Sequence, residues 1–412
     1  MRCLLLSLVA VAALSAADDG ELALTLRAQA DFDRVELSPA PRLEDATACE
    51  QSQAALLAVA GPEQGAALHY RKGICALTAA ALTGNAARFS DAAGEFGKAI
   101  ESWPARAKGA PAGPVSPALP VLAAIARLHA AADAAAGNAA GQRIAAAEAA
   151  PDCSSNLLPA AACRRWLAAG REWLGWLAVQ SGDLDAAARD FSGLDAAGWP
   201  EWIAGRRAFE EALYGQAAQH YARAVEAWRT IAREPAPALD VRLAPQPAMA
   251  SVLTDLGGAQ LLAGDPTAAI ATLNAAVKAG PADARTIYLR ARAKEKAGET
   301  QDALEDYNLA SRTAFAAARD LASGEAHLYR GILLYRRKDY TRAEDEFSSA
   351  LNFDIPAALR ADTVAWRHLA AVAGGACEAS RLELRQSLNS VSPYFPKDEA
   401  ASRIAACSAG GD

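Results

Sequence analysis

The feature that most constrains this chain of 412 residues is a helical segment that recurs at a fixed spacing. The stretch from Met249 to Pro281 holds two alanine-rich helical runs separated by a Gly-Asp-Pro turn, and a similar stretch follows it directly. Four positions recur at an offset of 34 residues: Gly264 with Gly298, Ala269 with Ala303, Leu273 with Tyr307, and Ala276 with Ala310. Such periodicity is typical of repeat architectures, so we expect stacked helical units.

Looser copies of the unit occur elsewhere. They keep the order of small and large residues around Phe96, Phe191, Tyr221 and Phe347. The pattern resembles the tetratricopeptide repeat, in which small residues lie where two antiparallel helices touch and a large residue fills the gap beside them. In the first unit these slots hold Gly257, Ala269, Leu273, Ala276 and Pro281. The resemblance covers most of residues 73–352 and implies an all-α fold, an α-solenoid of stacked antiparallel helix pairs.

Composition and the positions of proline and glycine suggest how the units are grouped. Hydrophobic residues make up 52% of the chain, with alanine prominent, while aromatics are only 6%, which favours helices over strands. We expect an N-terminal block of pairs over residues 49–233, which contains a Pro/Gly-rich linker at 104–120. A second linker at 234–248, a C-terminal block at 249–356 and a capping helical pair at 357–412 follow. Residues 18–48 form either a helix or an extended arm.

The first 17 residues have the layout of a secretory signal peptide. A basic residue precedes an apolar run, which ends in the small residues Ser15, Ala16 and Ala17. The alternative is a retained membrane anchor, although the apolar run is short for a membrane span. We therefore expect an exported protein, either periplasmic or secreted, with no membrane span after cleavage.

Six cysteines remain beyond this segment, and their spacing predicts disulfides. Cys49 and Cys75 are nearly symmetric about a turn between two helical runs, so they face each other if the runs form an antiparallel hairpin. The pairs Cys153–Cys163 and Cys377–Cys407 enclose loops in a similar way. Disulfides persist in oxidising compartments, which agrees with export. Metal binding is the weaker alternative, because CxxC motifs and neighbouring histidine pairs are missing. We expect the disulfides Cys49–Cys75 and Cys377–Cys407 to act as staples, which hold together the helical hairpins at the two ends of the repeat series.

The sequence lacks the usual signatures of an enzyme. Nucleophile-elbow, zinc-protease, dinucleotide-binding and P-loop motifs are missing, and the five histidines are scattered singly. We therefore expect a protein that is not an enzyme and has no cofactor or metal. A net charge of −7 also argues against nucleic acid as the partner, because such binding depends on neutralising phosphates.

Surface recognition is the remaining route to function. The resemblance implies that the first helix of each pair lines a concave groove that holds an extended peptide. Projecting that face onto this chain predicts the following groove residues: Trp176, Trp202, Arg206, Phe209, Arg285, Tyr288, Arg292, Lys296, Tyr335 and Arg336. A basic, aromatic groove suits an acidic or carboxylate-ended segment. Two alternatives stay open, because charges at helical spacing often form a solvated face and a tryptophan stripe often packs in a core.

We therefore expect a protein-interaction scaffold that binds peptide segments or partner subunits. The alternative is a glycan-binding envelope protein that uses the tryptophans between Trp166 and Trp202 as a stacking platform. An enzyme ranks last for lack of any motif.

Overall fold

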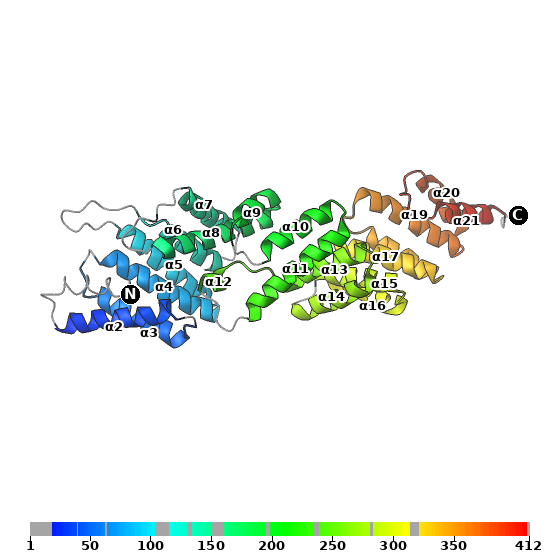
Figure 1. Ribbon diagram of the computed structural model, residues 1–412. Coiled ribbons are helices and arrows are strands. Elements are labelled where there is room, and N and C mark those ends of the chain that lie inside the picture. Colours follow the sequence, from blue (N-terminus) through cyan, green and yellow to red (C-terminus); the bar gives the residue numbers. More distant parts are fainter. Residues whose placement is uncertain are drawn as a thin grey trace. The chain divides into compact units, whose positions relative to one another are not determined.

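The computed structural model describes residues 19–38, 40–61, 64–103, 115–130, 134–149, 153, 160–194, 198–233, 239–280, 283–313 and 321–409. All regular structure in these ranges is helical, which confirms the predicted all-α class (Figure 1). The chain divides into two compact units, Met1–Ile203 with Ala227–Gln246 and Ala204–Glu226 with Pro247–Asp412. The predicted signal peptide, residues 1–17, lies outside the described residues. In the described ranges, none of the helices is both long and apolar enough to span a membrane.

The first unit is a series of helices that pack on one another in chain order. Its helices are α2 (Asp19–Glu36), α3 (Leu43–Leu57), α4 (Gly65–Thr83), α5 (Ala86–Glu101), α6 (Ala118–Ala130), α7 (Ala134–Glu148), α8 (Ala160–Ser181), α9 (Leu184–Phe191) and the short α12 (Leu239–Leu243). The segment before α3, for which the sequence left a helix or an arm open, is therefore largely helix α2. Helix α6 packs against α8 as well as against α7, so successive helix pairs stack on each other.

The second unit continues the same arrangement. Its helices are α13 (Met249–Leu262), α14 (Pro266–Ala279), α15 (Ala284–Ala297), α16 (Thr300–Thr313), α17 (Leu321–Arg336), α18 (Tyr340–Ala350), α19 (Ala357–Ala373), α20 (Cys377–Ser387) and α21 (Lys397–Ala409). The boundary between the units falls within α10 (Trp199–Glu210) and α11 (Tyr214–Arg233). In the second unit α13 packs on α15, α15 on α17, and α17 on α19. The first helices of successive pairs therefore lie side by side, as in tetratricopeptide-like repeats.

A glycine packed against a large side chain explains how each pair closes. A Cβ added at these glycines would lie 2.5–2.8 Å from the partner side chain, so only glycine permits this approach. The pairs are Gly73 with Phe96, Gly175 with Phe191, Gly205 with Tyr221, Gly257 with Leu273, and Gly331 with Phe347. The large partners are almost fully buried. These are the slots in which the sequence predicted helix contact, and the packing confirms the tetratricopeptide-like unit.

The turns inside the pairs have a common geometry. Gly264 has φ +90° in the turn before α14, and the carboxylate of Asp265 then caps that helix by accepting an N–H three residues on at 2.9 Å. Asp183 caps α9 in the same way at 2.8 Å. Ala212 and Lys338 occupy corresponding turns at φ 59° and 65°, in the left-handed region that disfavours residues with a Cβ.

The three disulfides pair in the predicted order. Cys49 on α3 is joined to Cys75 on α4, and Cys377 at the start of α20 is joined to Cys407 on α21. The third joins Cys153 to Cys163 on α8. The first and last bridges close hairpins at the two ends of the repeat series, which confirms the predicted staples.

A buried carboxylate links α4 to α5. Glu95 on α5 is 6% exposed and accepts hydrogen bonds from Lys72 at 3.1 Å and Lys98 at 2.9 Å. Its other oxygen lies 2.7 Å from Nδ1 of His69. Burial works against ionisation of Glu95, but these hydrogen bonds outweigh burial and lower its pKa to about 2. The carboxylate is therefore a charged clamp within one helix pair.

The predicted linker at 234–248 is tied to the first unit where it is described. Leu243 is buried, and its carbonyl accepts the indole N–H of Trp173 at 2.9 Å and lies 3.1 Å from Nε2 of His129. The indole N–H of Trp199 donates to the carbonyl of Pro245 at 3.1 Å. These bonds satisfy backbone groups that would otherwise be buried without partners. In the linker predicted at 104–120, residues 104–114 lie outside the described ranges, and α6 begins at Ala118.

Candidate functional site

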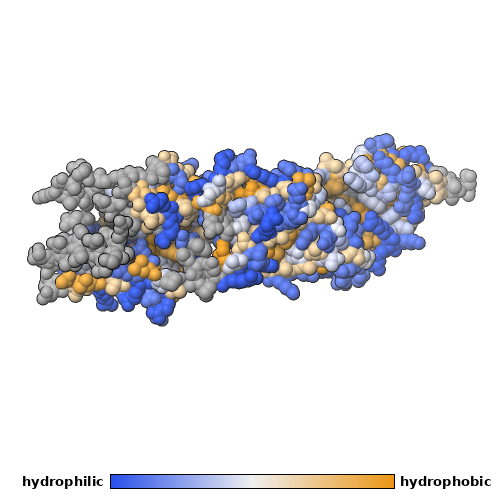
Figure 2. Space-filling view, viewed as in Figure 1, coloured by the Kyte–Doolittle hydropathy of each residue, from blue (hydrophilic) through white to orange (hydrophobic). Residues whose placement is uncertain are grey.

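A pocket of about 480 Å³ lies between α15 and α17 of the second unit. Its lining comes from the C-terminal halves of the two helices and the residues just after them: Arg292, Glu295, Lys296, Thr300, Tyr329, Ile332, Leu333, Arg336 and Arg337. Helices α15 and α17 are first helices of neighbouring pairs, which are the elements that the sequence predicts to line a groove. Figure 2 shows a mainly hydrophilic surface over much of this unit in the view drawn.

Arg292 is the most firmly held cation of the pocket. Its guanidinium carbon lies 3.7 Å from the ring centre of Tyr329, which is a close cation–π contact. It also donates to the hydroxyl of Tyr288 at 3.0 Å, while its Nε atom is buried with no hydrogen-bond partner in the described part of the chain. Only 24% of the side chain is exposed. The packing therefore fixes a charged donor at the pocket wall.

Glu295 is the one carboxylate among the lining residues. It accepts hydrogen bonds from Tyr307 at 2.7 Å and from Arg336 at 3.0 Å, and it lies 3.9 Å from Arg292. Each of its two oxygens therefore already accepts a hydrogen bond. Four cationic side chains line the same pocket, so their charge exceeds that of Glu295 by three. The excess cations would attract an anionic group.

Lys296 and Arg337 are the cations of the pocket that pair with no carboxylate of the described residues. Both are exposed, and Arg337 donates to the side-chain carbonyl of Gln301 at 3.2 Å. Lys296 has no ion pair or hydrogen bond with any residue that the structure describes. A partner could contact these two side chains without repacking the helices.

Two of the predicted groove residues are largely buried. Tyr288 is 7% exposed, and burial raises the pKa of its hydroxyl, which accepts the hydrogen bond from Arg292. Tyr335 is 5% exposed, donates to Glu399 at 2.6 Å and packs on Trp366. Their rings belong to the packing between helices, and Tyr288 reaches the pocket only through Arg292.

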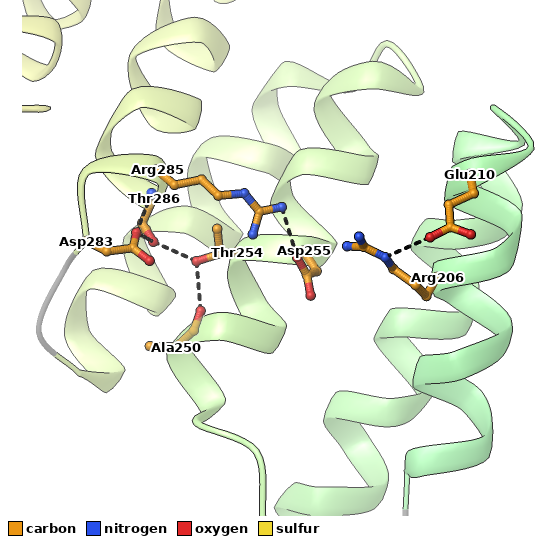
Figure 3. Close-up of polar contacts among 8 residues, drawn as sticks. All are labelled: Arg206, Glu210, Ala250, Thr254, Asp255, Asp283, Arg285 and Thr286. Carbon is orange, nitrogen blue, oxygen red and sulfur yellow. Dashed lines mark hydrogen bonds and ion pairs between the residues drawn. The ribbon is translucent and has the colours of Figure 1, made fainter. Parts of the chain in front are cut away.

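Two predicted cations lie outside the pocket and have acidic partners (Figure 3). Arg285 on α15 donates to Asp255 on α13 at 3.0 Å. Arg206 on α10 donates to Glu210 one turn later at 3.2 Å. Arg285, Arg292 and Lys296 are spaced by seven and four residues, which places them on one face of a helix. The structure brings only Arg292 and Lys296 together with Arg336.

Figure 3 also shows why Arg285 is held beside α13. Asp283 caps α15 by accepting from the Thr286 backbone at 2.7 Å and from its hydroxyl at 2.6 Å. The Thr286 hydroxyl lies 2.7 Å from that of Thr254 on α13. These buried contacts join two first helices and fix the register in which Arg285 meets its acidic partner.

The predicted aromatic residues of α8 and α10 do not join this pocket. Trp176 is partly buried against Trp173, with ring centres 5.3 Å apart, and Trp202 packs on Trp199 at 6.0 Å in the first unit. Phe209 packs on Tyr214 at 5.3 Å in the second unit. Trp166 and Trp173 are 1% and 6% exposed. Of the tryptophans proposed as a glycan platform, these two are therefore core residues.

The sequence pattern does not indicate several of the pocket residues. Tyr329 and Glu295 belong to no motif, although Tyr329 supports Arg292 and Glu295 orients Arg336. Arg337 follows the last residue of α17 and could have been found only as a neighbour of Arg336. Within the described ranges, no group of three or more His, Cys, Asp and Glu residues could hold a metal ion.

Comparison with known proteins finds distant likenesses among solved structures alone. No family model and no curated protein sequence matches it. Among solved structures, it is similar to a Rap protein complexed with competence and sporulation factor (14% identity, 69% of this chain and 74% of that chain, TM-score 0.41). Another is a STAND protein with a tetratricopeptide repeat sensor from Pyrococcus horikoshii (11% identity, 87% of this chain and 57% of that chain, TM-score 0.46). A third is yeast Tom70 (10% identity, 89% of this chain and 86% of that chain, TM-score 0.38).

These likenesses are too distant to carry a function. The class is defined by the chain's own packing, in which contacts of glycine with a large side chain close antiparallel pairs and the first helices lie side by side. The protein is an all-α, tetratricopeptide-like helical repeat protein.

Proposed function

We propose that this protein is an interaction scaffold that binds an acidic segment of a partner protein in the α15–α17 pocket. The main support is the excess of cationic side chains, four against one carboxylate, around a pocket of about 480 Å³. Arg292, held on Tyr329, supplies a fixed donor for a partner carboxylate. Lys296 and Arg337 add attraction at the accessible edge.

The N-terminal segment and the disulfides bear on the compartment in which the protein works. The N-terminal segment has the layout of a signal peptide, and three disulfides suit an oxidising compartment. We infer export to the periplasm or the medium, where the partner would be another envelope or secreted protein. A net charge of −7 disfavours nucleic acid as the partner.

The test is a titration followed by fluorescence anisotropy. The full chain is mixed with a labelled peptide rich in Asp and Glu, and with the same peptide carrying Asn and Gln in their place. We expect saturable binding of the acidic peptide alone. Its affinity should fall about tenfold between ~50 and ~300 mM salt, because exposed charges are screened.

Matched variants locate the binding. Lys296→Glu combined with Arg337→Glu reverses two exposed pocket charges, and we expect at least a tenfold loss of affinity, about 1.4 kcal/mol. Arg342→Glu is the control, because Arg342 is 63% exposed on α18 and does not line the pocket. Equal binding of the neutral peptide, or an equal loss in the control, would show that the pocket is not the binding site.

A further inference from the structure

A second pocket, of about 320 Å³, lies within the first unit. It is bounded by the end of α2 and the residues that follow, by one face of α4, and by the starts of α8 and α12. Val35, Ile74, Trp166 and Leu239 supply much of its apolar wall, and all except Leu239 are buried. A concavity of this size, with an apolar wall and a few polar groups, has the general character of a small-molecule site.

Two opposite charges line this pocket without pairing with each other. Glu36 comes from the last turn of α2, and Arg165 from the first turns of α8. Within the described part of the chain, Glu36 makes no ion pair and no hydrogen bond. Burial raises the pKa of Glu36, and the nearby Arg165 and Arg71 lower it. Arg165 and Glu36 are thus close enough to influence each other but are more than 4 Å apart.

Arg165 keeps donors available for a ligand. Its Nε atom lies 3.9 Å from Asp240, and its guanidinium carbon lies 5.2 Å from the centre of the Trp166 ring. Among the described residues it makes no hydrogen bond. Its planar fork is suited to a carboxylate.

Trp166 adds an independent sign that an acceptor belongs here. It is 1% exposed, and its indole N–H has no hydrogen-bond partner among the described residues. A buried donor without an acceptor costs about 1–3 kcal/mol, so such groups call for an explanation. Because the Trp166 side chain lines the pocket, we take the missing acceptor to be an oxygen of a bound ligand.

We propose that this pocket binds a small zwitterion with an apolar side chain, of which an apolar α-amino acid is the simplest case. Its carboxylate would meet Arg165 and the indole N–H of Trp166, and its ammonium group would meet Glu36. The apolar side chain would pack against the aliphatic wall. The site lies in the first unit, so it is independent of the peptide pocket proposed in the second.

Isothermal titration of the full chain with leucine and with phenylalanine tests the proposal. N-acetyl-leucine, which lacks the ammonium charge, and leucinamide, which lacks the carboxylate, are the matched ligands. We expect saturable binding of at least one free amino acid, and at least tenfold weaker binding of both derivatives. The proposal is overturned if neither amino acid binds at ~10 mM, or if N-acetyl-leucine binds as well as leucine.

Variants assign the two charges. Glu36→Gln should weaken leucine binding and leave N-acetyl-leucine binding unchanged, because the acetylated ligand has no ammonium group. Arg165→Gln should weaken leucine binding at least tenfold, while Arg164→Gln, an exposed neighbour outside the lining, should not. Matching thermal unfolding curves show that each variant folds. Equal losses in the two arginine variants, or no effect of Glu36→Gln on leucine, would contradict the assignment.

Discussion

Substituting Gly257 by alanine should destabilise the protein, although alanine is the better helix former. Gly257 lies inside α13, where the intrinsic gain from alanine is about 1 kcal/mol. An added Cβ would lie 2.5 Å from Cγ of Leu273 and 2.8 Å from its Cδ2, and Leu273 is fully buried. Overpacking of this kind costs about 1–3 kcal/mol. The Leu273 side chain branches at the contact atom and cannot simply swing away, so we expect a cost in the upper part of this range, about 2–3 kcal/mol. After the helix gain of about 1 kcal/mol, the net loss is about 1–2 kcal/mol.

The adjacent glycine provides the control. A Cβ at Gly258 would meet only Cδ1 of Leu289 at 3.4 Å, so Gly258→Ala should leave stability unchanged or raise it by up to about 1 kcal/mol. Thermal unfolding followed by circular dichroism should show a lower midpoint for Gly257→Ala, by roughly 2–8 °C for a unit of this size. Shortening the partner in a Leu273→Ala background should remove most of that added cost. Equal midpoints for the two single variants would refute the packing argument.

Three further perturbations test other parts of the fold. Glu95→Gln should cost about 1–2 kcal/mol at pH 7, allowing for solvent screening, because the pKa of Glu95 is lowered to about 2. This difference in unfolding free energy between the wild type and the variant is present above about pH 4.5 and is lost as the pH falls towards 2. Urea unfolding at several pH values will measure it. Ala212→Gly and Lys338→Gly should each raise the unfolding free energy by about 0.5–1 kcal/mol, since both positions have positive φ; a lower thermal midpoint would contradict this. Replacing Cys377 and Cys407 by alanine removes a disulfide that spans 30 residues, which is worth about 3–4 kcal/mol in the chain-entropy model. Hydrogen exchange should then accelerate in α21. Unchanged exchange there would show that the disulfide does not hold this terminal hairpin together.

The helix pairs were predictable because their signals are local. Gly257 and Leu273 recur in register with the turn between them, and the contact that they make is the one their spacing implies. Cysteine pairing also followed from local hairpin geometry. Both kinds of evidence lie within about one repeat of the chain, where helical periodicity relates sequence position to position on a face.

The sites depend on contacts that periodicity does not encode. Arg285 shares a helical face with Arg292, yet its charge is offset by Asp255 of the preceding pair, and only the packing of α13 against α15 reveals this. The pocket that contains Glu36 and Arg165 joins residues from distant parts of the chain, each unremarkable in its own segment. Charge spacing alone therefore predicted a broader basic face than the folded chain presents.

Hydrogen–deuterium exchange of the full chain, with and without a saturating amount of the acidic peptide, would locate the bound segment. We expect slower exchange in the C-terminal half of α15 and the second half of α17, around Arg292 and Arg336, with little change in α8 and α9. Protection confined to the first unit, or no protection of α15 and α17 at saturation, would contradict the assignment of the basic pocket as the binding site.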